Sequence, residues 1–91
     1  MTDNEFIRYF KRYAKESNHS VQWYWYTFYI QFGIAVNPTI YGYAQYYYNT
    51  RHITYYGHEY TIPVDTDGKI TYETFKDTMD FLVKEFDKIY F

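Results

Sequence analysis

The sequence predicts an α+β domain: an antiparallel sheet of three strands, or four if the last strand is divided, flanked by N- and C-terminal helices. The expected order is α-β-β-β-α. Apolar residues recur at helical spacing near both ends, residues alternate between two faces in the middle, and turn-forming residues divide that middle part. A chain of 91 residues has the size of one domain with a modest core, so residues 1–91 are expected to form a single domain.

The first helix is expected to begin at Thr2-x-x-Glu5, whose spacing is typical of a capping box. Apolar residues then recur every three or four positions, and cations gather on the opposite side. Ser17 and Asn18 are expected to end the helix, because their side chains compete for backbone hydrogen bonds. The apolar stripe consists of Phe6, Phe10, Tyr13 and Ala14, and the basic stripe consists of Arg8, Lys11, Arg12 and Lys15.

The stretch VQWYWYTFYIQF, residues 21–32, is expected to form the first strand, because it is rich in aromatic residues and alternates. Gly33 is expected to mark a bulge or a bend. With a period of two, one face of this strand would carry Tyr24, Tyr26, Phe28, Ile30 and Phe32, and the other Trp23, Trp25 and Tyr29.

Asn37-Pro38 indicates a turn, because proline presets φ and biases the residue before it away from helix. The second strand, residues 39–48, would place Tyr41, Tyr43 and Tyr47 on one face and small residues on the other, where a bulky group is expected to press. After a turn at residues 49–52, the third strand covers residues 53–64 and includes Tyr55. Gly57-His58 would divide it if these residues form a tight hairpin.

The C-terminal helix has the clearest periodic signal in the chain. Pro63 and the polar stretch 65–69 end the sheet, and the helix is expected from about Thr71 to the C-terminus. Two amphipathic helices are expected to cover one face of the sheet, which leaves the other face open to water. The apolar positions of this last helix are Tyr72, Phe75, Met79, Leu82, Phe86 and Ile89.

Composition sets limits on function. Fifteen tyrosines contribute to an aromatic share of 27%, and no Asp, Glu, Lys or Arg occurs from residue 17 to residue 50. The net charge of -2 is not that of an obvious nucleic-acid-binding protein. The absence of cysteine excludes disulfides and Cys-based zinc sites and favours a cytoplasmic protein. We expect no signal peptide and no interaction with a membrane.

Motif searches predict neither an enzyme nor a cofactor or metal site. Residues 63–74 fit a calcium-binding EF-hand loop poorly, because Pro63 and Thr74 occupy the positions that need carboxylates. The sequence HEYTI lacks the second histidine of the H-E-x-x-H zinc motif. No nucleophile elbow and no glycine-rich phosphate loop is present.

The leading hypothesis is a non-enzymatic protein that binds a protein partner, or a second copy in a homodimer, through an uncharged aromatic sheet face. Tyr and Trp are enriched at the centres of protein interfaces, whereas Lys and Glu are depleted. If the sheet is covered on both faces, these rings are core instead. The expected partner-binding residues are Trp23, Trp25, Tyr29, Tyr41, Tyr43, Tyr47 and Tyr55.

By analogy of size and style alone, the most specific expectation is a phage or mobile-element inhibitor of a host protein, like the anti-CRISPR proteins. Acidic residues of the last helix, Glu73, Asp77, Asp80 and Asp87, could contact a basic partner by imitating phosphates, although lysines lie between them. Carbohydrate stacking is a further option for the rings. The main alternative is a single-stranded nucleic-acid-binding protein that combines the aromatic residues with the basic stripe Arg8, Lys11, Arg12 and Lys15.

Overall fold

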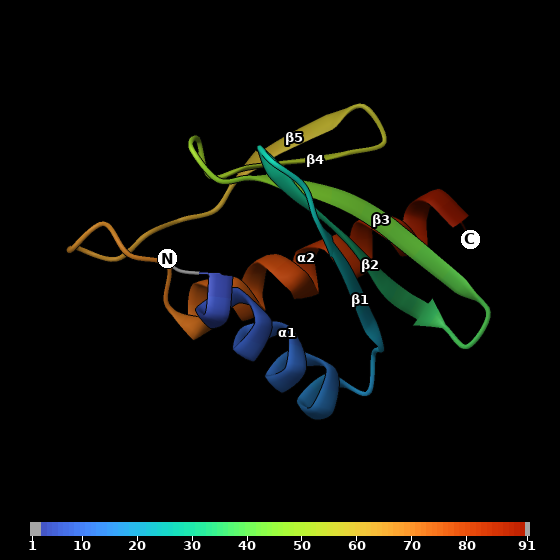
Figure 1. Ribbon diagram of the computed structural model, residues 1–91. Coiled ribbons are helices and arrows are strands. Elements are labelled where there is room, and N and C mark those ends of the chain that lie inside the picture. Colours follow the sequence, from blue (N-terminus) through green and yellow to red (C-terminus); the bar gives the residue numbers. More distant parts are fainter. Residues whose placement is uncertain (1–2, 91) are drawn as a thin grey trace.

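The computed structural model describes residues 3–90 and confirms the α+β class, with an antiparallel sheet whose strands lie between two helices in the sequence (Figure 1). Both helices lie on the same side of the sheet. The sheet has five strands in a simple meander, β1-β2-β3-β4-β5, so there are more strands than the three or four expected. The elements are α1 (Asp3–Ser17), β1 (Val21–Trp25), β2 (Tyr29–Asn37), β3 (Ile40–Tyr47), β4 (His52–Tyr55), β5 (His58–Thr61) and α2 (Tyr72–Tyr90).

The end of α1 and the beginning of α2 agree with the sequence. α1 ends at Ser17, whose hydroxyl donates a hydrogen bond to the Tyr13 carbonyl (2.6 Å). α2 begins after Thr71, which caps it: the Thr74 backbone N–H donates to the Thr71 hydroxyl (3.2 Å). The expected capping box of the first helix includes Thr2, which lies outside the described residues.

The additional strand arises because the long first stretch folds back on itself. β1 and β2 form a hairpin around residues 26–28, closed by a hydrogen bond from the Tyr26 N–H to the Tyr29 carbonyl (2.9 Å). The register places Trp25 opposite Ile30 and Trp23 opposite Phe32. Directly opposed residues of an antiparallel pair point to the same face. Both tryptophans therefore share a face with Ile30, so their predicted grouping with Tyr29 is wrong.

The third expected strand is divided into β4 and β5, one residue earlier than Gly57-His58 suggested. Tyr55 lies opposite His58, so the two-residue turn consists of Tyr56 and Gly57. Both turn residues have positive φ, 47° and 83°, as the two-residue turn that best matches the strand twist requires. Glycine adopts such angles without strain, whereas tyrosine rarely does, so the tyrosine conceals the turn in the sequence.

The turn between β2 and β3 lies where Asn37-Pro38 predicted it. The Asn37 side-chain oxygen accepts hydrogen bonds from the backbone N–H groups of Thr39 and Ile40, both at 2.9 Å. The irregularity of β2 falls between Ala35 and Asn37, and Gly33 pairs regularly with Tyr43. The bulge expected at Gly33 is therefore displaced toward the turn.

The core lies between the sheet and the helices. The helices contribute mainly aromatic residues, the strands contribute both aliphatic and aromatic ones, and all of them are almost completely buried. Ile89, the last member of the predicted stripe of α2, is exposed. The buried residues of this layer include Phe6, Phe10 and Tyr13 from α1, Ile30, Phe32 and Ile34 from β2, Ile53 from β4, and Phe75, Met79, Leu82 and Phe86 from α2.

Gly42 of β3 allows α2 to approach the sheet closely. A Cβ atom at this position would overlap three atoms of the Phe86 ring, which is the bulky group that Gly42 and Ala44 predicted. Gly33, on the opposite face, is covered by Tyr43, whose Cε1 would lie 2.8 Å from an added Cβ. Phe86 is fully buried, whereas Tyr43 is 39% exposed, so only Tyr43 has room to move away.

We therefore expect Gly42→Ala to lower the free energy of unfolding by about 1–3 kcal/mol, the usual cost of overpacking a well-filled core. Gly33→Ala is the matched control and should cost clearly less, because the exposed Tyr43 ring can rotate away. Urea unfolding followed by circular dichroism measures both values. Equal losses in the two variants would contradict the proposed contact with Phe86.

Candidate functional site

The sheet face that the helices leave uncovered carries a group of tyrosines, called here the tyrosine face. Register places Tyr24 opposite Gln31, Gln31 opposite Gln45, and Gln45 opposite Thr54, so these residues share the outer face. The tyrosines of this face alternate along their strands with residues of the core. They are Tyr24 of β1, Tyr29 of β2, and Tyr41, Tyr43 and Tyr47 of β3.

Contacts between neighbouring rings hold the tyrosine face in place. Tyr29 and Tyr47 are directly opposed across β2 and β3, with ring centroids 5.2 Å apart. Tyr26, in the β1–β2 loop, stacks on Tyr29 at 5.0 Å, and Tyr41 stacks on Tyr43 at 6.3 Å. Such pairs contribute beyond the area they bury. The rings are thus partly pre-ordered and still reach solvent, with Tyr24 57% and Tyr47 36% exposed.

The tyrosine face is nearly free of charge. Between its rings lie amide and hydroxyl groups, and the Thr54 hydroxyl donates to the Gln45 side-chain oxygen (2.9 Å). Among the residues that the structure describes on this face, formal charge enters only toward β5, where Glu59 pairs with His52 Nδ1 at 2.5 Å. Within the described residues, no lysine or arginine lies on this face.

Three of the predicted partner-binding residues lie on the opposite, helix-covered face. Trp23 stacks on Phe10 of α1, with ring centroids 5.5 Å apart and planes at 14°. Tyr55 is 4% exposed and donates a hydrogen bond to Glu85 of α2 (3.2 Å). Trp25 stacks on Tyr48 at 6.1 Å near the margin of the sheet and remains 37% exposed. Trp23, Trp25 and Tyr55 therefore do not join the tyrosine face.

Four of the predicted residues, Tyr29, Tyr41, Tyr43 and Tyr47, do lie together on the open face. Sequence reasoning missed Tyr24 and Tyr26, which it grouped with core residues. Because the chain reverses direction in the β1–β2 hairpin, Trp25 and Tyr29 lie on opposite faces of the sheet, although a continuous strand would place them on the same face. The loop of this hairpin also exposes Phe28 (69%). The tip contains no glycine, proline or asparagine, so no ordinary turn signal was present to reveal it.

The basic stripe Arg8, Lys11, Arg12 and Lys15 is exposed on α1, in the helix layer and thus on the other side of the molecule from the tyrosine face. Arg12 is also engaged within the molecule. Its Nε lies 3.0 Å from Glu16, and its guanidinium lies 3.8 Å from the centre of the Tyr72 ring. Glu16 in turn accepts a hydrogen bond from the Tyr72 hydroxyl (3.0 Å).

The acidic residues Glu73, Asp77, Asp80 and Asp87 all lie on α2, and Asp80 has an internal structural role. Its carboxylate accepts hydrogen bonds from the hydroxyl of buried Tyr13 (2.8 Å) and from Lys76 (3.0 Å). Burial, the largest single cause, acts to raise the pKa of Asp80, but these two hydrogen bonds together with the charges of Lys76 and Lys84 outweigh it and lower the pKa overall. The other three carboxylates are exposed.

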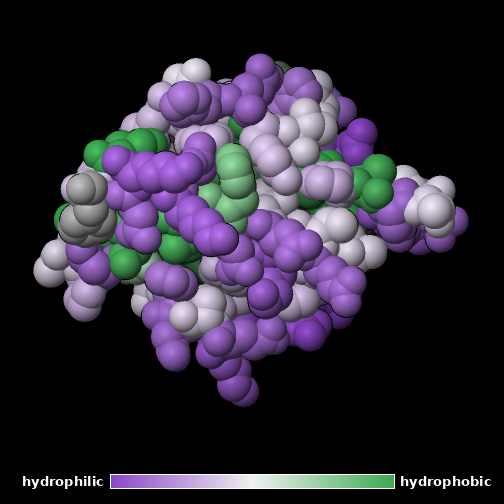
Figure 2. All heavy atoms as spheres, turned by 180° about the vertical axis from the view of Figure 1, so that it is seen from behind, coloured by the Kyte–Doolittle hydropathy of each residue, from purple (hydrophilic) through white to green (hydrophobic). Residues whose placement is uncertain are grey.

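The back of the molecule is mostly hydrophilic, with hydrophobic residues in separate smaller patches (Figure 2). Residues 3–90 contain no cluster of three metal-binding side chains. The Asp65 carboxylate, which belonged to the weak calcium motif, instead accepts backbone N–H bonds from Asp67 and Lys69, at 2.9 and 2.8 Å. None of the described helices is long and apolar enough to cross a membrane.

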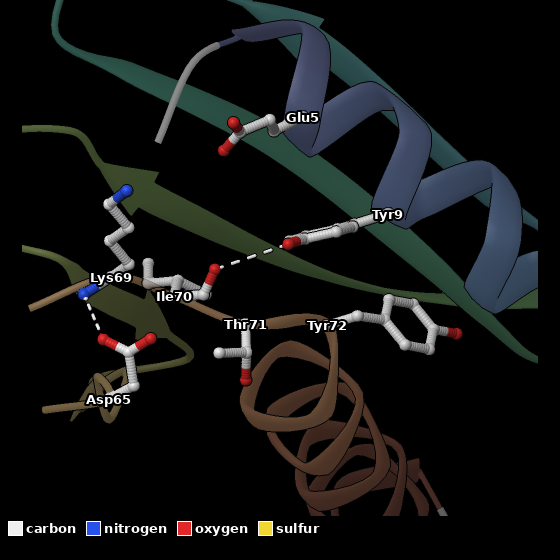
Figure 3. Close-up of a pocket in the computed structure, with 7 residues that line it drawn as sticks. All are labelled: Glu5, Tyr9, Asp65, Lys69, Ile70, Thr71 and Tyr72. Atoms are coloured by element: carbon white, nitrogen blue, oxygen red, sulfur yellow. Dashed lines mark hydrogen bonds between the residues drawn. The ribbon is translucent and has the colours of Figure 1, made fainter. Parts of the chain in front are cut away.

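A hollow of about 370 Å³ separates the first turns of α1 from the segment before α2 (Figure 3). Tyr9 points across it and donates a hydrogen bond to the Ile70 carbonyl (3.4 Å). Charged groups of both signs, from Glu5, Asp65 and Lys69, surround the hollow without converging on one point. The described residues that line the hollow do not form an arrangement typical of a catalytic or cofactor site.

Comparison of the chain with protein-family models, with curated proteins and with solved structures gave no match.

We expect the hydrogen bonds of the Asp80 carboxylate with Lys76 and Tyr13 to make the free energy of unfolding depend on pH. Since the folded-state pKa of Asp80 is lowered, its stabilising effect is complete above the unfolded-state pKa of about 3.9 and is lost as pH falls through the folded-state value. Asp80→Asn should therefore lower stability at neutral pH, and the difference from wild type should shrink below about pH 4.

Urea unfolding at a series of pH values measures this difference. Asp77→Asn, an exposed site on the same helix, is the matched control and should change stability little throughout. A difference between Asp80→Asn and wild type that stays constant down to the acid limit would contradict the assigned role of the carboxylate.

Proposed function

We propose that this protein is a non-enzymatic binding protein whose tyrosine face recognises the surface of a protein partner. The observation that carries the proposal is an open sheet face with five tyrosines on three adjacent strands and no lysine or arginine among the described residues of that face. Open faces of antiparallel sheets ordinarily alternate to charged or polar residues. An uncharged face of rigid rings instead resembles the centre of a protein interface.

The chemistry of the rings suits recognition. Tyrosine buries a large area while fixing only two side-chain torsions, and its hydroxyl can still find a polar partner. Stacking between Tyr41 and Tyr43, and between Tyr26 and Tyr29, further reduces the entropy that binding would cost. Gln31 and Gln45 lie between the rings and supply donors and acceptors that fix orientation.

A protein partner is favoured over single-stranded nucleic acid by the distribution of charge. Nucleic-acid affinity depends largely on phosphate neutralisation by Lys and Arg. The basic stripe lies on α1, across the sheet from the tyrosine face, so a strand stacked on the tyrosines would not reach these cations without wrapping around the molecule. The tyrosine face therefore offers stacking without a source of neutralisation.

The finer form of the proposal is a blocking inhibitor that acts by occupying its partner's surface. A small domain with a broad recognition face and no catalytic motif suits such a role, and phage or mobile-element inhibitors of host proteins, the anti-CRISPR class among them, are the proteins of this style. We place the interaction in the cytoplasm, of the host cell if the protein is phage-encoded, because the chain is free of cysteine.

The test compares two sets of variants in affinity capture from a lysate of the native host. Tyr43→Ala/Tyr47→Ala removes two partly exposed rings and should abolish capture of the partner with little loss of stability. Arg8→Ala/Lys11→Ala/Lys15→Ala is the matched control on the other side of the molecule and should capture the partner as wild type does.

A labelled single-stranded oligonucleotide is titrated in parallel at low salt, and the proposal expects no binding. Salt-sensitive binding that is lost in the basic-stripe variant would replace the proposal with the nucleic-acid function. Capture that survives in the tyrosine variant, or is lost in the basic-stripe variant, would assign recognition to a different surface. Circular dichroism of each variant shows whether the fold is retained.

A further inference from the structure

The two margins of the sheet differ in how they are protected against strand pairing. β5 forms one margin and has only four residues, carries His58 and Glu59, and is followed closely by Pro63. Short length, charge and proline are the usual means by which proteins protect an edge strand. The half of β3 that extends beyond β4 is protected against strand pairing by side chains. The Tyr43 N–H donates a hydrogen bond to the Tyr56 hydroxyl (3.2 Å), and this hydroxyl also contacts Tyr90.

β1, which has five residues, forms the other margin and lacks the charged residue and the proline that protect β5. Its sequence, VQWYW, contains no charge, proline or glycine, and it pairs with β2 over all five residues without a bulge. Within residues 3–90, no strand lies along its outer side. α1 packs beneath β1, since Phe10 stacks on the helix-side face of Trp23. An unprotected edge of this kind is a template for another strand.

The direction of the free backbone groups follows from the bonds at both ends of β1. The Ala35 N–H donates to the Ser20 carbonyl (2.8 Å), and the Tyr26 N–H donates to the Tyr29 carbonyl (2.9 Å). Even-numbered residues of this strand therefore direct their backbone groups to β2, and by alternation the odd-numbered residues direct theirs outward. The outward residues are Val21, Trp23 and Trp25.

We propose that β1 pairs with β1 of a second copy of this chain, antiparallel and centred on Trp23, so that two sheets join into one. Hydrogen bonds between the two strands can form only in a register that places residues with outward-directed backbone groups opposite one another. A register centred on Trp23 pairs all three such residues, because Val21 lies opposite Trp25 of the second copy and Trp23 lies opposite Trp23. This interface goes beyond the proposed function, because it uses the margin of the sheet; it shares Tyr24 with the tyrosine face but leaves Tyr43 and Tyr47 free.

A second copy fits this edge better than an unrelated strand for two reasons. Residues 17–50 carry no charged side chain, so the strand meets its own copy without like-charge repulsion. Trp25 is 37% exposed on the helix-side face at this margin, and Val21 of the second copy would cover it. On the outer face, Gln22 of each copy would lie directly opposite Tyr24 of the other.

This last pair gives a test of both the dimer and its register. In Gln22→Lys/Tyr24→Lys, the lysine at position 22 of each copy would lie opposite the lysine at position 24 of the other copy. This like-charge repulsion should raise the dimer dissociation constant about tenfold or more. Gln22→Lys/Tyr24→Glu loses the same tyrosine but opposes lysine to glutamate, so it should restore most of the dimer. Sedimentation equilibrium at low ionic strength measures the constants, and circular dichroism establishes that each variant is folded.

Two controls separate this interface from the tyrosine face and from the other margin. Thr61→Lys on β5 and Tyr43→Ala/Tyr47→Ala should both dimerise as wild type does. A wild-type protein that stays monomeric at about 1 mM would overturn the proposal, because even a dissociation constant of that size would give much dimer. The proposal would also be overturned if Gln22→Lys/Tyr24→Lys dimerised as tightly as wild type. The same holds if Gln22→Lys/Tyr24→Glu dimerised no more tightly than Gln22→Lys/Tyr24→Lys.

Discussion

The packing of Phe10 is the interaction on which the rest of the structure depends. Its ring is fully buried and contacts Trp23 of β1, Phe32 of β2 and Phe75 of α2, with ring centroids 5.3 to 5.5 Å apart. One side chain of α1 thus touches both strands of the first hairpin and the second helix. Because this contact fixes both helices to one face of the sheet, it also determines which face remains open.

The same arrangement explains how a small domain accommodates fifteen tyrosines. All fifteen tyrosines lie within the described range 3–90, and of these only Tyr13, Tyr46 and Tyr55 are buried. The hydroxyls of Tyr13 and Tyr55 donate to carboxylates of α2, and burial is the largest cause that raises the pKa of each of these two phenols. The remaining tyrosines keep some contact with water, so their hydroxyls do not require partners within the chain.

Much of the fold could be predicted from the sequence, because amphipathic periodicity is a local property. The stripe from Phe75 to Phe86 indicated α2 directly, and Gly42 indicated a close approach that Phe86 makes. The β1–β2 hairpin could not be predicted, since Tyr26, Thr27 and Phe28 have strand propensity and no turn signal. In the folded structure this hairpin allows Trp23 of β1 and Phe32 of β2 to pack together against Phe10, a tertiary contact that the local sequence does not reveal.

The assignment of the β1 residues to the wrong faces of the sheet accounts for most of the difference between the expected site and the observed tyrosine face. It moved Trp23 and Trp25 from the open face to the helix side and brought Tyr24 to the open face. The predicted faces of the β3 residues were correct, because the Asn37-Pro38 turn determines which β3 residues point to each face, independently of the first hairpin. An assignment of residues to sheet faces from alternation therefore depends on the correct placement of the nearest turn, because a shift of one residue moves every side chain of the strand to the other face.

The separation of the basic stripe from the neutral tyrosine face also bears on the kinetics of association. Long-range attraction between charged patches can accelerate encounter by orders of magnitude, whereas neutral surfaces dock at about 10⁵–10⁶ M⁻¹s⁻¹. A face whose formal charge lies only at its β5 margin gains little from such steering. Tight complexes formed through it would owe their affinity to slow dissociation, and their lifetime would change little with ionic strength.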